Sequence, residues 1–117
     1  VLVSDAADPA ACERTVAEAA EALAGLDALV LNVGIGKGVG LAGTSADDWD
    51  EVFAVNLRSH FLSLKTALPL MPEGSSTVLI SSIAGLRPGS GIPSTAASRR
   101  SNARSSRQAS SYDGLVR

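Results

Sequence analysis

Residues 26–34 read Leu-Asp-Ala-Leu-Val-Leu-Asn-Val-Gly, and this stretch decides the fold. Its apolar residues follow one another with little alternation, which is typical of a strand in a parallel sheet covered on both faces. The run ends at Asn32, and residues 34–40 then contain four glycines. Because glycine adopts backbone angles that other residues resist, this segment is predicted to be a flexible loop. Loops that follow strands of this kind bind ligands.

Two helices are predicted on either side of the strand. The first covers residues 10–24, with Asp8 as its cap, Pro9 in its first turn and Gly25 at its end. The second covers residues 47–68, where apolar side chains recur at helical spacing and acidic residues occupy the first turn.

Two further apolar runs, residues 1–3 and 77–80, are predicted to be strands. The order is therefore β-α-β-α-β, which predicts a parallel sheet with right-handed crossovers. Ligands of such sheets lie beyond the carboxyl ends of the strands. Three segments fall there: residues 5–6, 32–34 and 81–82.

Composition limits the class of protein. A chain of 117 residues with 45% apolar residues forms at most one globular domain. It has no charged-then-apolar leader and no apolar run of about 18 residues, so we expect no membrane insertion and a cytoplasmic location. Because the chain opens on Val1 inside an apparent strand, we expect it to be a fragment. The single cysteine, Cys12, is expected to be a small buried residue.

Several motifs recur at fixed distances along residues 1–93. Asn32 and Gly34 match an Asn-Asn-Ala-Gly segment in which the first Asn and the Ala have been replaced. Asn56 follows 24 residues after Asn32, and Ser82 ends an apolar strand. In this order and spacing the chain resembles the short-chain dehydrogenase/reductase family. The resemblance implies a partial Rossmann-like, doubly wound parallel sheet, with residues 1–93 as its central part.

The resemblance also implies a nicotinamide cofactor, NAD or NADP. Asp5, Ala6, Asn32 and Gly34 are the expected cofactor-binding residues, and Asp5 is similar to the family's Asp that contacts the adenine ring. The family's glycine-rich loop for the pyrophosphate would lie upstream of Val1. The residue that would distinguish NAD from NADP would lie there as well.

The resemblance implies hydride transfer to or from a small-molecule secondary alcohol or ketone. Asn56 would fix a water in the proton relay, and Ser82 would hold the substrate oxygen. The family's Tyr and Lys fall at Thr95 and Arg99, 13 and 17 residues after Ser82. A Thr hydroxyl is far less acidic than a phenol, and Arg does not release its proton. We therefore expect loss of most activity, and the alternative is an inactive Rossmann-like remnant with weak or no nucleotide binding.

Residues 94–117 differ in character from the rest of the chain. Their net charge is +4, against −6 for residues 1–93, and residues 94–111 contain seven Ser and four Arg but no large aliphatic residue. Three interpretations remain: a disordered basic tail, a nucleic-acid-binding arm and a reading-frame slip near Ser94. The arm lacks aromatic stacking groups, so we expect no nucleic-acid partner. The frame slip is favoured.

Structural roles compete with the functional ones. Asn32 could tie down its loop, and Ser82 could cap the turn that follows it. His60 has no cluster of ligating side chains around it in the sequence, so it is expected to be a packing residue and no metal is implied. Trp49, Phe53 and Leu57 recur at a spacing of four. They are expected to be core or to form a homo-oligomer contact, as the equivalent helix does in the family.

Overall fold

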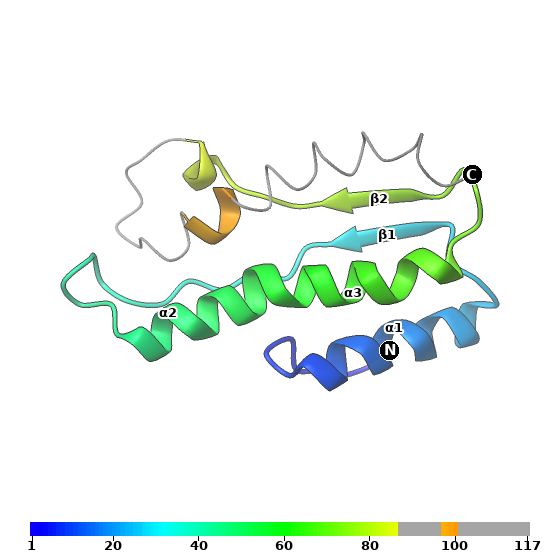
Figure 1. Cartoon of the computed structure of the whole chain (residues 1–117), viewed down its shortest axis with the longest axis horizontal. Coiled ribbons are helices and arrows are strands. Elements are labelled where there is room, and N and C mark those ends of the chain that lie inside the picture. Colours follow the sequence, from blue (N-terminus) through cyan, green and yellow to red (C-terminus); the bar gives the residue numbers. More distant parts are fainter. Residues whose placement is uncertain (87–96, 101–117) are drawn as a thin grey trace.

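The computed structural model describes residues 1–86 and 97–100, arranged as helices packed on a short sheet (Figure 1). Residues 97–100 are helical. The other elements, in chain order, are α1 (Pro9–Leu23), β1 (Ala28–Leu31), α2 (Ala46–Phe53), the π-helical turn η1 (Ala54–Arg58), α3 (Ser59–Ala67), the 3-10 turn η2 (Leu68–Leu70), β2 (Ser76–Leu79) and the 3-10 turn η3 (Ile83–Gly85).

The ends of α1 follow from local chemistry, as predicted. Asp8 is the N-cap, and its side chain accepts a hydrogen bond from the backbone N–H of Ala10. Pro9 has no backbone N–H, and the first turn of a helix tolerates this because an N–H there would have no partner within the helix. At the other end, Ala24 adopts a left-handed conformation and Gly25 has a φ of 140°. A positive φ at Gly25 carries no Cβ penalty, so the chain turns there toward β1.

The second predicted helix is continuous but not uniform. Ser45 caps α2 by accepting from the N–H of Asp48, and the helical path then runs through η1 into α3. The sequence predicted a single helix over residues 47–68. The structure inserts one π-helical turn, whose wider spacing shifts the faces of the helix that precede and follow it. Asn56 lies in the middle of that turn.

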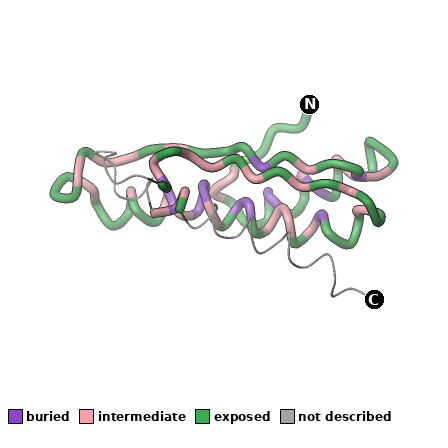
Figure 2. The backbone as a smooth tube through the Cα atoms, turned by 90° about the horizontal axis from the view of Figure 1, so that it is seen from above, coloured by how far each residue is buried: buried purple, intermediate pink, exposed green. Residues whose placement is uncertain are grey.

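The sheet consists of two parallel strands in the described residues. β1 pairs with β2 in the register Ala28↔Ser76 to Leu31↔Leu79. In Figure 1, α3 lies between β1 and α1, so both long helices are on the same side of the sheet. Buried positions concentrate where these layers meet (Figure 2), and Val16, Leu26 and Ala67 form their centre.

Two details of the predicted sheet are wrong. Residues 1–3 form no strand and are exposed. Val30 and Val78, which are partners in the register, are 62% and 48% exposed, so no described residue buries their face of the sheet. An uninterrupted apolar run predicts burial on both faces, but burial also needs a second layer.

Four residues of the Ser- and Arg-rich C-terminal segment belong to the described structure. Residues 97–100 are helical and Ser98 is fully buried, so this part packs against the rest of the molecule. The remainder, residues 94–96 and 101–117, lies outside the described residues. None of the helices in the described part of the chain is long and apolar enough to cross a membrane.

Candidate functional site

The carboxyl ends of β1 and β2 meet at one edge of the sheet. Leu31 and Leu79 are partners at the ends of the two strands, and the N–H of Ile80 extends the ladder by donating to Leu31 O over 2.9 Å. The segments that follow, residues 32–34 and 80–82, therefore begin side by side. Asn32, Gly34 and Ser82, which the sequence singled out from two separate motifs, therefore all follow the strand ends at this edge of the sheet.

Asn56 ties the loop after β1 to the long helix. Its Oδ1 accepts from Ile35 N over 2.7 Å, and its Nδ2 donates to Ile35 O over 2.9 Å and to Ser98 Oγ over 3.1 Å. The side chain is fully buried. These bonds pair both backbone groups of Ile35, so the Asn56 side chain positions the residues that follow Gly34.

Ser82 caps the short turn that follows β2. Its Oγ accepts from the N–H of Ala84 over 3.2 Å, at the start of η3. This is the structural role that the sequence left open. The bond uses one acceptor site of a half-buried hydroxyl and does not use its proton. The same oxygen can therefore cap the turn and donate to a ligand at the strand ends.

Arg99, which the resemblance predicts to stand in the position of the family's Lys, reaches the same edge. Its Nη1 donates to Ile80 O over 3.0 Å, and its own carbonyl accepts from Ser81 Oγ over 2.7 Å. Its guanidinium lies against Gly34, where an added Cβ would be 1.6 Å from Nη2 and 2.6 Å from Cζ. Thr95, the residue predicted to stand in the Tyr position, lies outside the described residues.

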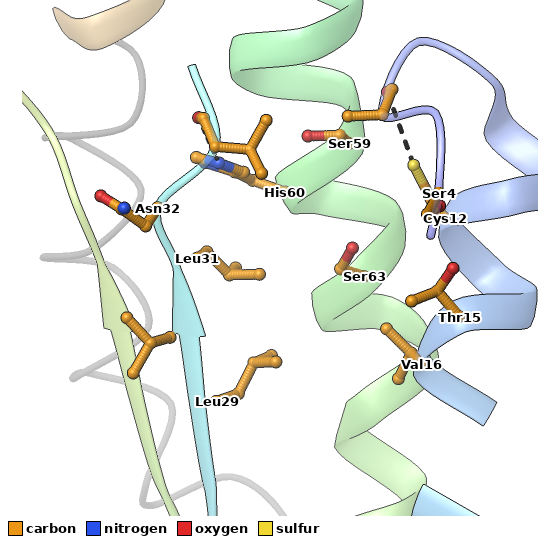
Figure 3. A pocket seen from close by; sticks show the side chains of 13 residues that line it. Ser4, Cys12, Thr15, Val16, Leu29, Leu31, Asn32, Ser59, His60 and Ser63 are labelled. Carbon is orange, nitrogen blue, oxygen red and sulfur yellow. Dashed lines mark hydrogen bonds between the residues drawn. The ribbon is translucent and has the colours of Figure 1, made fainter. Parts of the chain in front are cut away.

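A cavity of about 240 Å³ opens beside β1, between α1 and α3 (Figure 3). Ala6 and Asn32, two predicted cofactor-binding residues, line it together with hydroxyl-bearing side chains of both helices. The cavity thus links the segment after residues 1–3 to the end of β1. Asp5 precedes Ala6 in the sequence. The Oδ1 of Asp5 accepts from Ala7 N over 2.8 Å, which closes the turn that leads into α1.

The sequence did not reveal two residues that hold this site. Arg58, at the end of η1, donates from Nη2 to Ala7 O over 2.9 Å, so it joins the long helix to the turn before α1. Ser98 supplies the hydroxyl bonded to Asn56 and is fully buried. Both contacts join residues more than 40 positions apart, and local spacing contains no signal for them.

Cys12 is buried in α1, as predicted, and its Sγ donates to Ala6 O over 3.5 Å. Burial raises the pKa of the thiol, and the negative charge of Asp8 raises it further. Because the thiolate is the nucleophilic form, this environment disfavours reactivity. Cys12 is a packing residue of the cavity wall.

His60 is also buried, and its Nε2 lies 3.1 Å from Val33 O. Burial lowers the pKa of the ring below its ordinary value of 6.5, the bond to Val33 O opposes that shift, and the positive charge of Arg99 adds to it. The ring is therefore neutral in the folded chain near neutral pH. No group of three or more His, Cys, Asp or Glu in the described residues is placed to hold a metal.

The lowered pKa of His60 predicts a loss of stability in mild acid. Below pH 6.5 the unfolded chain binds a proton at this position that the folded chain resists, so the free energy of unfolding falls as the pH drops toward the folded pKa. Thermal unfolding between pH 7.5 and 5 measures this loss. His60→Gln, which keeps a donor but does not titrate here, should lose less over the same range. Equal losses would contradict the assignment.

Comparison with known proteins gives a consistent result. The family model described as Enoyl-(Acyl carrier protein) reductase matches residues 1–112. A putative short-chain type dehydrogenase/reductase of Mycolicibacterium smegmatis is 39% identical over 87 residues, which cover 71% of this chain and 31% of that protein. The chain thus spans about a third of the length of that curated relative.

Solved structures agree in fold. A short-chain dehydrogenase/reductase from Serratia marcescens BCRC 10948 superposes with a TM-score of 0.90 at 30% identity, covering 97% of this chain and 46% of that one. A blue fluorescent protein from a metagenomic library, solved in complex with NADPH, gives 0.89 at 29% identity, with 95% and 45% covered. The α/β arrangement is therefore Rossmann-like, as predicted, and the chain belongs to the short-chain dehydrogenase/reductase family.

Proposed function

We propose that the chain is the central part of a cytoplasmic, NAD(P)-dependent oxidoreductase domain. Its lineage transfers hydride between a nicotinamide ring and a small-molecule secondary alcohol or ketone. The observation that supports the proposal is that Asn32, Gly34 and Ser82 follow the carboxyl ends of two paired parallel strands. Ligands of open α/β sheets lie in that crevice.

In this proposal the substrate oxygen lies near Ser82. Its hydroxyl caps η3 as an acceptor, which leaves its proton available for donation to a second partner. Asn56 acts indirectly, because its buried amide holds Ile35 and thereby positions the backbone after Gly34. Ala6 lines the same cavity as Asn32, and in this proposal the adenine side of a nucleotide would lie near Ala6 and the preceding Asp5.

We infer that the described residues do not fit a nicotinamide nucleotide as they stand. Gly34 is the position at which a missing side chain leaves space beside the backbone, and the guanidinium of Arg99 fills that space. We therefore assign no reaction step to a bound cofactor. This disagreement favours a second candidate function, in which the chain is a family member that has lost its chemistry and keeps its scaffold. We call this the silent candidate.

Thr95 and Arg99 support the silent candidate on chemical grounds. A proton donor and acceptor at the substrate oxygen contributes roughly 10²–10⁴-fold to a rate. A Thr hydroxyl cannot reach the acidity of a phenol, and a guanidinium holds its proton at any working pH. For the chain with these residues we propose no turnover.

Titration with NADH and NADPH separates the two candidates. We expect no saturable change in nucleotide fluorescence below about 1 mM, which corresponds to a binding free energy weaker than about 4 kcal/mol. The same chain unfolded in denaturant supplies the baseline for inner-filter effects. Saturable binding of either nucleotide at micromolar concentration would refute the silent candidate and favour an active enzyme.

We also propose that the continuous helical segment of α2, η1 and α3 forms a homo-oligomer contact. Trp49 and Phe53 stack with ring centroids 4.9 Å apart, and Trp49 is 38% exposed. Phe61, two turns after Phe53, is 61% exposed. Aromatic side chains that project from one helix are enriched where protein surfaces associate.

A further inference from the structure

The space over Gly34 is filled by the chain's own side chain. An added Cβ there would meet three atoms of the Arg99 guanidinium within 3.2 Å, and Gly34 needs no left-handed backbone angle. Gly34 is therefore required by the lack of room for a side chain and not by its backbone angles, because the Arg99 guanidinium occupies the place of a Cβ. The guanidinium also donates to Ile80 O, so it bridges the ends of β1 and β2.

The backbone around Arg99 is held against the same edge. Ser81 Oγ donates to Arg99 O over 2.7 Å, and Asn56 Nδ2 donates to Ser98 Oγ next to it. Gly85 completes the contact, because an added Cβ at that position would lie 2.9 Å from Arg100 N and from Arg99 C. The helical turn of residues 97–100 is thus docked by contacts that do not involve the guanidinium.

The guanidinium itself is held more weakly than its backbone. Within residues 1–86 and 97–100, no carboxylate lies within ion-pair distance of Arg99. Among the described residues, one exposed hydrogen bond, to Ile80 O, retains the group over Gly34. A bond of this kind contributes little net stability, so the side chain can leave while the turn stays docked.

We propose that Arg99 is an internal occupant of the ligand crevice, seated over Gly34 so that it excludes a nicotinamide group from the ends of β1 and β2. The inference rests on the proposed function, because it takes this edge to be the cofactor crevice. Its physical content is a steric competition between one guanidinium and one planar ring for the same space.

The seating is tested in the chain without any ligand, by a double-mutant cycle of Gly34→Ala and Arg99→Ala followed by thermal unfolding. Each single change should lower Tm by about 4 °C, since each removes the guanidinium from Ile80 O. In the Arg99→Ala background, Gly34→Ala should cost almost nothing more. Additive losses would overturn the seating. Arg99→Met, which keeps the aliphatic stem, serves if Arg99→Ala does not fold.

The exclusion is tested with reduced nicotinamide mononucleotide, which carries the nicotinamide half alone. Its fluorescence titration should give a Kd at least about tenfold lower for Arg99→Ala than for the natural chain, because the ring no longer competes with the guanidinium. Equal affinity would overturn the exclusion even if the thermal coupling is present. The silent candidate is tested separately, by NADPH binding to the natural chain. A failure of that candidate can therefore be distinguished from a failure of the seating or of the exclusion.

Discussion

Replacing Asn56 with Leu is expected to lower the free energy of unfolding by about 2–4 kcal/mol. The Asn56 side chain is fully buried and pairs the N–H and C=O of Ile35, with distances of 2.7 and 2.9 Å. Leu keeps the branched shape of Asn but leaves the N–H and C=O of Ile35 without this partner. A buried polar group without a partner costs about 1–3 kcal/mol, which sets the size of the loss.

Chemical denaturation measures this loss, and Ser98→Ala is the matched control. That change removes only one of the Asn56 bonds, so it should cost about 1 kcal/mol. The order of the two effects matters more than their size. If Asn56→Leu costs no more than Ser98→Ala, the bonds to Ile35 do not hold the loop, and the positioning role of Asn56 fails.

Much of the framework could be predicted from the sequence because it depends on neighbours along the chain. The Asp8 cap, the Pro9 start and the Gly25 end of α1 are local effects, and the structure has all three. Apolar runs placed β1 and β2 within two residues of their bounds. Parallel pairing then follows from the alternation of strand and helix, and it brings the strand ends to one edge.

What could not be predicted depends on contacts between distant segments. The composition of residues 54–58 does not predict a π-helical turn, because it suits an ordinary α-helix. The Asn56 bond to Ser98 joins residues 42 apart, and the position of the Arg99 guanidinium depends on the space at Gly34. Conversely, an apolar run at Val30 could not reveal that its face has no cover from the described residues.

We propose a genetic explanation for Thr95 and Arg99 at the positions where the resemblance predicts Tyr and Lys, and this explanation predicts a large gain in activity. The charge reversal and the loss of large apolar residues both begin near Ser94, whereas the strands before it keep their apolar character. Gradual loss of constraint would scatter substitutions through those strands as well. A single-nucleotide shift would change every later residue at once, and it would replace the expected Tyr and Lys by Thr95 and Arg99.

Translating the gene in another frame from about codon 94 is therefore expected to restore a Tyr-x-x-x-Lys motif followed by an amphipathic helix. Nucleotide sequencing of the region checks the motif. An activity assay of the reframed protein, in its complete domain, checks the chemistry, with a gain of about 10²–10⁴-fold over the same domain carrying Thr95 and Arg99. The family match extends to residue 112, past the predicted shift, so genuine substitution is the competing explanation. If all three frames lack the motif, the shift is wrong, and Thr95 and Arg99 belong to a protein that has abandoned its family's chemistry.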